Sequence, residues 1–235
     1  MTAPLTEPGV SAVVPAAGSG TRFGGAKLWA ELAGQPVLAW VFRALGDPSA
    51  GVTELVVVAD PMDHRRIIEL SSELAPRLGC SCVRGGARRQ DSVRNGLELT
   101  TQEWVVVHDG ARPAVTPELV ARVVAAAQRV GAATAYVPVV DSTARLVGAR
   151  VEAFLPRGEL GAIQTPQAFR RELLLRAHRQ AMTTGLEADD DAALVLALAE
   201  PVAAVPGDPS NLKVTRTQDI SALRTWLSAQ EGTRP

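Results

Sequence analysis

Residues 10–27 read VSAVVPAAGSGTRFGGAK, a short apolar run followed by a turn rich in glycine and other small residues. Continuous apolarity over 10–14 is typical of a strand buried on both faces, as in a parallel sheet covered by helices. The turn begins at the carboxyl end of this strand, where open α/β sheets bind their ligands. Small residues let several backbone N–H groups approach an anion closely. The stretch therefore predicts an α/β fold with an anion-binding turn after the first strand.

The same pattern recurs along the chain, because further Val-rich runs alternate with helical patterns. We expect buried strands at 55–58, 104–107, 135–140 and 202–205. We expect helices at 37–45, 63–74, 91–99, 117–130, 170–184, 191–199 and 218–229. The fourth of these helices has Thr116 in position to act as its N-cap and Pro117 at its first position. This alternation predicts a single domain over 1–235 with a doubly wound, mostly parallel, Rossmann-like sheet.

Residues 141–166 interrupt the alternation. Within them, 147–154 reads as a short hairpin with Gly148 near its turn, and it has too few apolar residues to be stable on its own. Two interpretations stay open at this point: an arm that packs on another subunit, or a long surface loop.

Composition excludes several classes of function. The formal net charge of −1 provides no basic surface of the kind that duplex nucleic acid requires. No apolar run approaches the roughly 20 residues that span a bilayer, and residues 1–9 lack the charged and apolar regions of a secretory signal. The two cysteines, Cys80 and Cys82, stand one residue apart, which argues against a structural disulfide or a four-ligand zinc site. We therefore expect a cytoplasmic protein that binds neither nucleic acid nor a membrane.

The glycine-rich turn matches neither of two common nucleotide-binding motifs. A dinucleotide motif G-x-G-x-x-G that starts at Gly18 would need glycine where Phe23 stands. A Walker A motif that starts at Gly20 would need its lysine one residue before Lys27. The turn instead carries two cations, Arg22 and Lys27, and a triphosphate attacked at phosphorus needs cations to stabilise charge on the α-phosphate and the departing pyrophosphate. The turn therefore predicts nucleotidyl transfer, and a surface loop with incidental charges is the alternative.

Lysine is rare in this chain, which makes its positions informative. Of 24 lysine and arginine residues, only Lys27 and Lys213 are lysines. Lysine is a compact charge on a flexible stem, and arginine is not always a substitute for it at a phosphate. Because Lys27 lies in the glycine-rich turn, we favour a role at phosphate groups for Lys213 as well.

Two further clusters lie between a strand and a helix. In residues 85–92, glycines permit close approach to a base and Ser92 can donate to a phosphate or a base edge, but a capped helix after a tight turn explains the same residues. After the strand at 104–107, Asp109 is suited to a magnesium ion or a ribose hydroxyl. An ion pair with Arg112 is the structural alternative for Asp109.

The remaining acidic and histidine residues suggest no separate site. The three acids at 189–191 fit the N-terminus of a helix better than they fit a metal site. His64 and His178 lie in helical patterns without an acidic or cysteine partner nearby, so we expect both on the surface. No stretch resembles the G-x-S-x-G motif of hydrolases.

Taken together, these motifs resemble the 2-C-methyl-D-erythritol 4-phosphate cytidylyltransferase family over nearly the whole chain. The shared motifs, in chain order, are 15–20 with Arg22 and Lys27, 86–92, 108–113, 164–167 and 213–215. The family joins CTP to methylerythritol phosphate and releases pyrophosphate, in non-mevalonate isoprenoid synthesis. The resemblance implies that Mg²⁺ takes part and that the protein is a homodimer whose arm, at 141–166, packs on the second subunit.

The resemblance also implies a role for individual residues. The side chains that it implies act in catalysis are Arg22, Lys27, Arg157 and Lys213. The residues that it places at CTP are Pro15, Ala16, Ala17, Gly18, Gly20, Gly86, Asp91, Ser92, Asp109 and Gly110. The residues that it places at the acceptor phosphate are Arg112, Asp141, Ser142, Arg157, Thr165 and Lys213, of which Ser142 and Arg157 come from the second subunit. Asp109 would also lie beside Mg²⁺, which is held mainly by the triphosphate.

The chain departs from the family pattern at four positions, mostly in the acceptor region. The positions are Gly110 for the usual alanine, Ser142 for threonine, Ala144 for lysine and Asp189 for threonine. Arg145, next to Ala144, is a possible replacement for the missing lysine. Two alternatives therefore stay open: cytidylyl transfer to another polyol phosphate such as ribitol 5-phosphate, and a non-catalytic regulatory module that binds a nucleotide.

Overall fold

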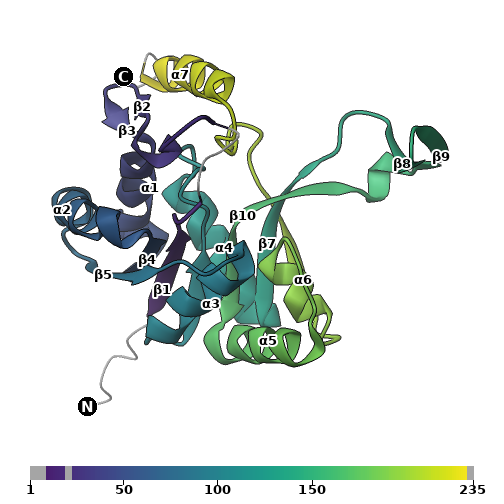
Figure 1. The fold of residues 1–235 in the computed structure, drawn as a ribbon, viewed down its shortest axis with the longest axis horizontal. Helices are drawn as coiled ribbons and strands as arrows, with labels where there is room; N and C mark the ends of the chain where they lie inside the picture. Colours follow the sequence, from purple (N-terminus) through teal and green to yellow (C-terminus); the bar gives the residue numbers. More distant parts are fainter. Residues whose placement is uncertain (1–8, 19–22, 232–235) are drawn as a thin grey trace.

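The computed structural model describes residues 9–18 and 23–231, and seven strands of this part form one sheet in the order β11-β7-β10-β6-β1-β4-β5 (Figure 1). The strands of this sheet are β1 Val10–Pro15, β4 Val52–Ala59, β5 Gly79–Arg84, β6 Trp104–Val107, β7 Ala132–Pro138, β10 Gly161–Arg170 and β11 Ala203–Pro206. The α-helices are α1 Val37–Gly46, α2 His64–Leu74, α3 Arg89–Leu99, α4 Pro117–Val130, α5 Arg171–Thr184, α6 Asp191–Leu196 and α7 Thr217–Glu231. Two small hairpins, β2 Glu31–Leu32 with β3 Gln35–Pro36 and β8 Thr143–Val147 with β9 Arg150–Leu155, lie outside the sheet.

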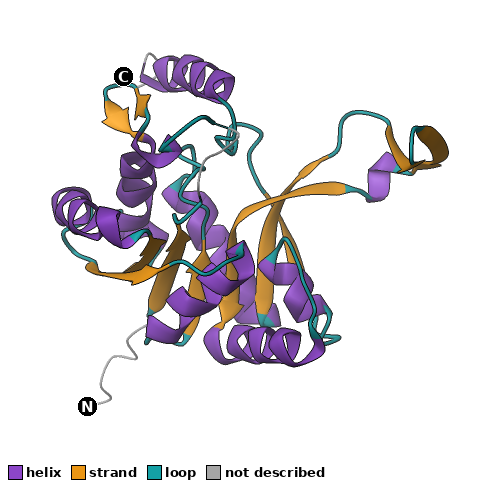
Figure 2. Ribbon diagram, in the orientation of Figure 1, coloured by secondary structure: helices purple, strands orange, loops and turns teal. Residues whose placement is uncertain are grey.

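Helices cover both faces of the sheet, so the expected doubly wound α/β architecture is confirmed (Figure 2). Side chains of β1 alternate between two buried clusters: Ala12 and Val14 pack with residues of α1, α2, α4 and α7, whereas Val13 packs with residues of α3, α5 and α6. This alternation follows from the pleat of a strand, which directs successive side chains to opposite faces. Continuous apolarity in β1 therefore reflects burial on both sides.

The sheet is mixed, because β10 runs antiparallel to both of its neighbours, β6 and β7. All other pairings in the sheet are parallel. The sequence pattern did not predict β10, because its buried centre contains the polar residues Gln164, Thr165 and Gln167 rather than a continuous apolar run. Pro166 lies in the same strand, at an irregularity in the pairing with β7, where a strand tolerates a residue without an N–H group.

The position of β10 also corrects the expected extent of the arm. The range 141–166 includes residues 164–166, and these are buried in the central sheet. The part that projects from the body is 139–160, called the arm below, and it contains the β8–β9 hairpin (Figure 1). Gly148 lies at the turn of this hairpin with a φ of 57°, as the hairpin pattern predicted.

Most predicted elements are present with shifts of a few residues at their ends. The predicted helix 117–130 is α4, and the Thr116 side chain accepts a hydrogen bond from the backbone N–H of Leu119, which confirms the expected N-cap. Within the described residues, none of the helices combines the length and the apolar character that a membrane crossing requires.

The contact between α3 and the sheet depends on a glycine. A Cβ atom built on Gly96 would lie 2.7 Å from a methyl carbon of Val13 and 2.7 Å from one of Val58, and both valines are fully buried. We expect Gly96→Ala to lower the free energy of unfolding by about 1–3 kcal/mol, because an extra methyl group here overpacks the core. Urea denaturation measures this change.

Gly79→Ala is the matched control, because no heavy atom lies within 4 Å of a Cβ built there. This control should change the free energy of unfolding by no more than about 0.5 kcal/mol. Equal stability of the two variants would contradict the close packing of α3 on β1 and β4.

Candidate active site

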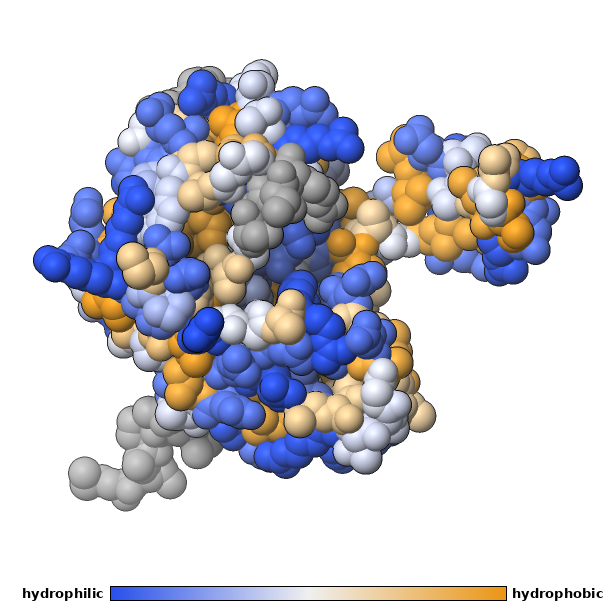
Figure 3. Space-filling model, viewed as in Figure 1, coloured by the Kyte–Doolittle hydropathy of each residue, from blue (hydrophilic) through white to orange (hydrophobic). Residues whose placement is uncertain are grey.

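A cleft of about 480 Å³ opens at the carboxyl ends of β1 and β6, beside the start of α3. Figure 3 shows that this face of the molecule is hollowed near its centre. The residues that line the cleft are Pro15, Ala16, Ala17, Gly18, Lys27, Leu28, Gly86, Ala87, Arg88, Arg89, Ser92, Asp109, Ala111 and Lys213. The cleft therefore brings together the glycine-rich turn, the 85–92 cluster, Asp109 and both lysines, which lie in four separate parts of the sequence.

The carboxylate of Asp109 is the main charged group in the wall of the cleft. It follows β6 and is only 6% exposed. Its Oδ2 atom lies 2.7 Å from Nζ of Lys213, and its Oδ1 atom accepts a hydrogen bond of 3.2 Å from Nε of Arg89. Nε of Arg112 lies 3.9 Å from Oδ2. Burial raises the pKa of Asp109, but the charges of Arg89 and Lys213 outweigh this effect and hold the pKa well below its ordinary value, so the group is ionised.

A chain of hydrogen bonds fixes the backbone of Asp109. His108 is fully buried, and burial lowers the pKa of its imidazole to about 4, so the ring is neutral at pH 7. Its Nε2 atom lies 3.1 Å from the carbonyl oxygen of Arg112 and must donate to it, which leaves Nδ1 as an acceptor for the hydroxyl of Thr165 at 3.2 Å. That hydroxyl oxygen in turn accepts a hydrogen bond of 3.0 Å from the N–H of Asp109.

The segment that carries Lys213 is held in place by the neighbouring loop and by β10. The N–H of Val214 donates to the carbonyl oxygen of Ala111 at 2.8 Å. Arg112 donates from Nη1 to the carbonyl oxygen of Asn211 at 2.7 Å, and Asn211 donates from Nδ2 to the carbonyl oxygen of Thr165 at 2.8 Å. These contacts explain how Lys213 comes to line the same cleft as Lys27.

The glycine-rich turn that follows β1, called the first turn below, packs directly on the strands beside it. The N–H of Ala16 donates to the carbonyl oxygen of Val58 at 2.7 Å, and the N–H of Gly110 donates to that of Pro15 at 3.2 Å. Lys27 begins a short 3-10 helix, Lys27–Trp29, and is one of the residues that line the cleft. Gly20 and Arg22, which the resemblance places in this site, lie outside the residues that the structure describes.

The second turn, at 85–92, is shaped by Ser92 and by its glycines. The hydroxyl of Ser92 accepts a hydrogen bond from the N–H of Gly86 at 3.0 Å and donates to the carbonyl oxygen of Arg88 at 3.1 Å. Its bonds therefore hold the turn, in addition to any contact with a ligand. A Cβ atom on Gly85 would lie 2.3 Å from Cβ of Ala17, so glycine is required for the two turns to approach each other.

Several residues that the resemblance places in the site support the cleft rather than line it. Asp91 forms a capping box at the start of α3, where it contacts the backbone and side chain of Arg88. Gly110 packs under the first turn, and a Cβ atom there would lie 3.2–3.3 Å from Val14, Leu38 and Pro15, so an alanine would fit only with a small shift. Arg112 and Thr165 position Asp109 through the contacts described above.

The arm holds the other acceptor residues apart from the cleft. Asp141 and Ser142 are exposed at the start of the arm, and Arg157 donates from Nη1 to the carbonyl oxygen of Val140 at 3.2 Å. None of these three residues lines the cleft of the same chain. Arg145, considered as a replacement cation, lies 3.7 Å from Glu152 across the hairpin.

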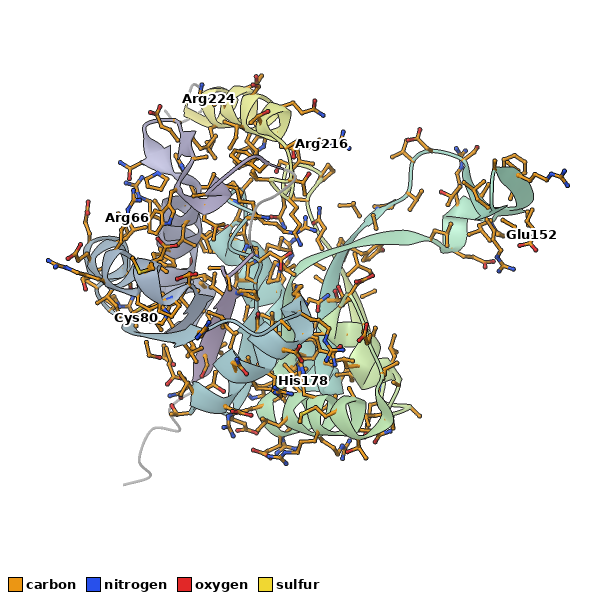
Figure 4. All side chains as sticks on the ribbon, viewed as in Figure 1. Arg66, Cys80, Glu152, His178, Arg216 and Arg224 are labelled. Carbon is orange, nitrogen blue, oxygen red and sulfur yellow. The ribbon has the colours of Figure 1, made fainter. Side chains whose placement is uncertain are left out.

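His178, which is labelled in Figure 4, is buried, so the expectation that it lies on the surface is wrong. His178 is 1% exposed, and its Nε2 atom lies 3.4 Å from Oδ1 of Asp191, without the alignment of a hydrogen bond. The missed signal is helical spacing, because His178 follows the buried Leu174 by four residues and precedes the buried Ala181 by three. His64 is partly buried, with Nε2 3.3 Å from the carbonyl oxygen of Ala59.

Arg89 is a further residue that no sequence motif indicated, and its guanidinium forms ion pairs with both Asp109 and Asp191. The three acids at 189–191 do begin a helix, since Asp190 accepts a hydrogen bond from the N–H of Ala192 at the start of α6. Asp191, however, is buried in an ion pair, which the helix-dipole interpretation did not predict.

The described residues contain no group of three or more histidine, cysteine or acidic side chains that could hold a metal ion. Asp109, the predicted neighbour of Mg²⁺, has one carboxylate oxygen on Arg89 and the other on Lys213. An Mg²⁺ ion beside Asp109 would need most of its six oxygen ligands from other groups, and phosphates and water can supply these.

Comparison with known proteins assigns the family. The model of the 2-C-methyl-D-erythritol 4-phosphate cytidylyltransferase family matches residues 10–228. The chain is 41% identical to the enzyme of that name from Synechococcus elongatus, over 94% of this chain and 97% of the relative. It is 44% identical to a bifunctional IspD/IspF enzyme from Anaeromyxobacter, over 94% of this chain but only 58% of that longer relative.

A solved structure of a protein from this family has the same fold as this chain. The 2-C-methyl-D-erythritol 4-phosphate cytidylyltransferase of Thermus thermophilus superposes with a TM-score of 0.77 at 38% identity, covering 94% of this chain and 99% of that one. The chain therefore belongs to the 2-C-methyl-D-erythritol 4-phosphate cytidylyltransferase family, and it is a nucleotidyltransferase that transfers the cytidylyl group of CTP to this phosphate in the non-mevalonate pathway.

Proposed function

We propose that the cleft catalyses this transfer by positioning and charge neutralisation, without a general base. The observation that carries the proposal is that Lys27 and Lys213, which are 186 residues apart in the sequence, line one cleft. The nucleophile is a phosphate monoester with a second pKa near ~6, so it is largely ionised at neutral pH and needs no base to activate it. His108, the histidine nearest to the cleft, is buried, neutral and fully occupied by hydrogen bonds.

In the proposed step, an oxygen of the acceptor phosphate forms a bond to the α-phosphorus of CTP. The bond from this phosphorus to the oxygen bridging to the β-phosphate breaks, and pyrophosphate leaves with the electron pair. Lys27 and Lys213 stabilise the negative charge that develops, together with Arg22 by resemblance. The backbone of residues 15–18 and Gly86 lines the part of the cleft that we assign to CTP. Mg²⁺, bound mainly to the triphosphate, would add to this neutralisation.

We assign the acceptor to the side of the cleft at Lys213 and Asp109, and we propose that a second copy of the chain completes it. Asp141, Ser142 and Arg157 do not line the cleft of their own chain, so they can meet the acceptor only if a partner's arm brings them there. The arm exposes Leu146, Val151 and Phe154 by more than half of their surface, which is the kind of apolar area that a subunit interface buries. This supports a homodimer formed through the arm.

We propose that the enzyme is cytoplasmic. Cys80 and Cys82 are both free thiols, and thiols remain reduced in that compartment.

Substrate choice is tested by release of pyrophosphate from each of the four nucleoside triphosphates, with methylerythritol phosphate or ribitol 5-phosphate as acceptor. We expect release with CTP and methylerythritol phosphate, and at least about tenfold slower release with any other pair, since buried polar contacts discriminate at this level or more. Faster release with ribitol 5-phosphate would overturn the assignment of methylerythritol phosphate as the acceptor. No release with any pair would show a nucleotide-binding module without transferase activity.

The proposal that Arg157 of one chain acts at the cleft of the other chain is tested by co-expressing Arg157→Ala chains with Lys27→Ala chains. Each variant alone should be nearly inactive, because every one of its sites lacks one essential cation. A mixed dimer contains one site with both cations, so an equal mixture should recover about one quarter of the normal activity. A mixture as inactive as the separate variants would contradict the assignment of Arg157 to the partner's site.

A further inference from the structure

A buried carboxylate, Asp191, lies behind the wall of the cleft. It is 1% exposed, begins α6 and is not among the residues that line the cleft. Its Oδ2 atom accepts a hydrogen bond of 2.7 Å from Nη1 of Arg89, while Oδ1 faces His178. Burial raises the pKa of Asp191, but the positive charge of Arg89 outweighs this effect and holds the pKa below its ordinary value, so the group is ionised. A buried charge of this kind persists only where its partners compensate for the loss of water.

Arg89 connects this buried carboxylate to the one in the cleft. Its Nη1 atom contacts Asp191 and its Nε atom contacts Oδ1 of Asp109, so one planar guanidinium bridges the two acids. The opposite oxygen of Asp109 contacts Lys213. The side chains thus alternate in charge in the order Asp191, Arg89, Asp109, Lys213, from behind the wall to the phosphate site.

The loop before α6 is tied to the start of α3 at several points around Arg89. Gln90 donates from Nε2 to the carbonyl oxygen of Leu186 at 3.2 Å and accepts from the N–H of Ala188 at 3.1 Å. Arg88 forms an ion pair with Glu187. These contacts hold Asp191 at a defined place relative to the second turn of the cleft, so the ion pair with Arg89 is part of a larger interface.

We propose that Arg89 and Asp191 are positioning residues of the transfer reaction, which orient the carboxylate of Asp109 and, through it, the ammonium group of Lys213. Asp191 accepts a hydrogen bond from Nη1 of Arg89, so that Nε of Arg89 donates to only one oxygen of Asp109. The other oxygen stays directed at Lys213. This inference rests on the proposed placement of Lys213 at the reacting phosphates.

Loss of the charge on Asp191 changes how Arg89 and Lys213 share the two carboxylate oxygens of Asp109. Arg89 then has one remaining carboxylate partner, and it competes with Lys213 for both oxygens of Asp109. Lysine at position 89 has a similar effect for a different reason, because a compact ammonium group lacks the planar fork that bridges two carboxylates. Both changes leave the residues that line the CTP part of the cleft intact.

The test compares kcat and KM for CTP in Asp191→Asn, Arg89→Lys and a control, Glu200→Gln. The control removes the same charge from a surface ion pair with Arg176, outside the cleft. We expect kcat to fall by about tenfold in Asp191→Asn and in Arg89→Lys, the size of one lost charge-assisted contact. KM for CTP should stay within about threefold, and the control should match the unchanged enzyme.

A double-mutant cycle with Lys213→Gln separates positioning from general loss of structure. If Asp191 acts through Lys213, Asp191→Asn should lower kcat by less than about twofold in the Lys213→Gln background. The same tenfold loss in both backgrounds, or kcat unchanged in Asp191→Asn, would overturn the inference.

Arg89→Lys keeps the inference testable if Asp191→Asn does not fold, because Arg89 is partly exposed and the charge is retained. An unchanged kcat in Arg89→Lys would then overturn it. Failure of the proposed function is distinguishable, since it would appear as absence of pyrophosphate release in the unchanged enzyme.

Discussion

The contact between the carboxylate of Asp109 and the ammonium group of Lys213 is the interaction on which the organisation of the cleft depends. It joins the end of β6 to a segment about one hundred residues later, at a distance of 2.7 Å. Cations gathered at one place repel each other, and a carboxylate among them reduces this repulsion. Lys213, Arg89 and Arg112 all lie within 4 Å of Asp109. Among the described residues that line the cleft, the charged groups are four cations, Lys27, Arg88, Arg89 and Lys213, and one carboxylate, Asp109, and this excess of positive charge suits a polyanionic substrate.

The mixed sheet explains why these groups meet. Because β10 runs antiparallel between β6 and β7, its Gln164 and Thr165 reach the carboxyl ends of β6 and β7 from the opposite direction. Thr165 there holds the backbone of Asp109, and Gln164 and Thr165 hold the 208–214 segment through Asp208 and Asn211. The polar character of β10 therefore positions both partners of the central ion pair. The same strand connects the arm to the sheet, so the arm and the cleft share one element.

The sequence predicted the parts of the molecule whose signals are local. Buried parallel strands such as β6 have continuous apolar runs, and α4 has a proline and a threonine cap at its start. The sequence pattern did not predict β10, because hydrogen bonds rather than apolar contacts stabilise the buried centre of this strand. It placed Asp109 and both lysines in the site, but not the bridge from Arg89 to Asp191, whose partners are 102 residues apart. Such a pairing is created by the packing of α3 against α5 and by the contacts of α3 with the loop before α6, and no local pattern records it.

The measurement that tests this account most directly is the single-turnover rate of Asp109→Asn with CTP and methylerythritol phosphate at saturation, alongside the affinity for CTP. If the carboxylate orients Lys213 and separates the cations, the rate should fall by about a hundredfold, the usual effect of misplacing one charged group that acts in the transition state. The affinity for CTP should change far less than the rate, because residues 15–18 and Gly86, which we assign to CTP, are unchanged. A rate within about twofold of the unchanged enzyme would show that Lys213 holds its place without Asp109 and would contradict the account.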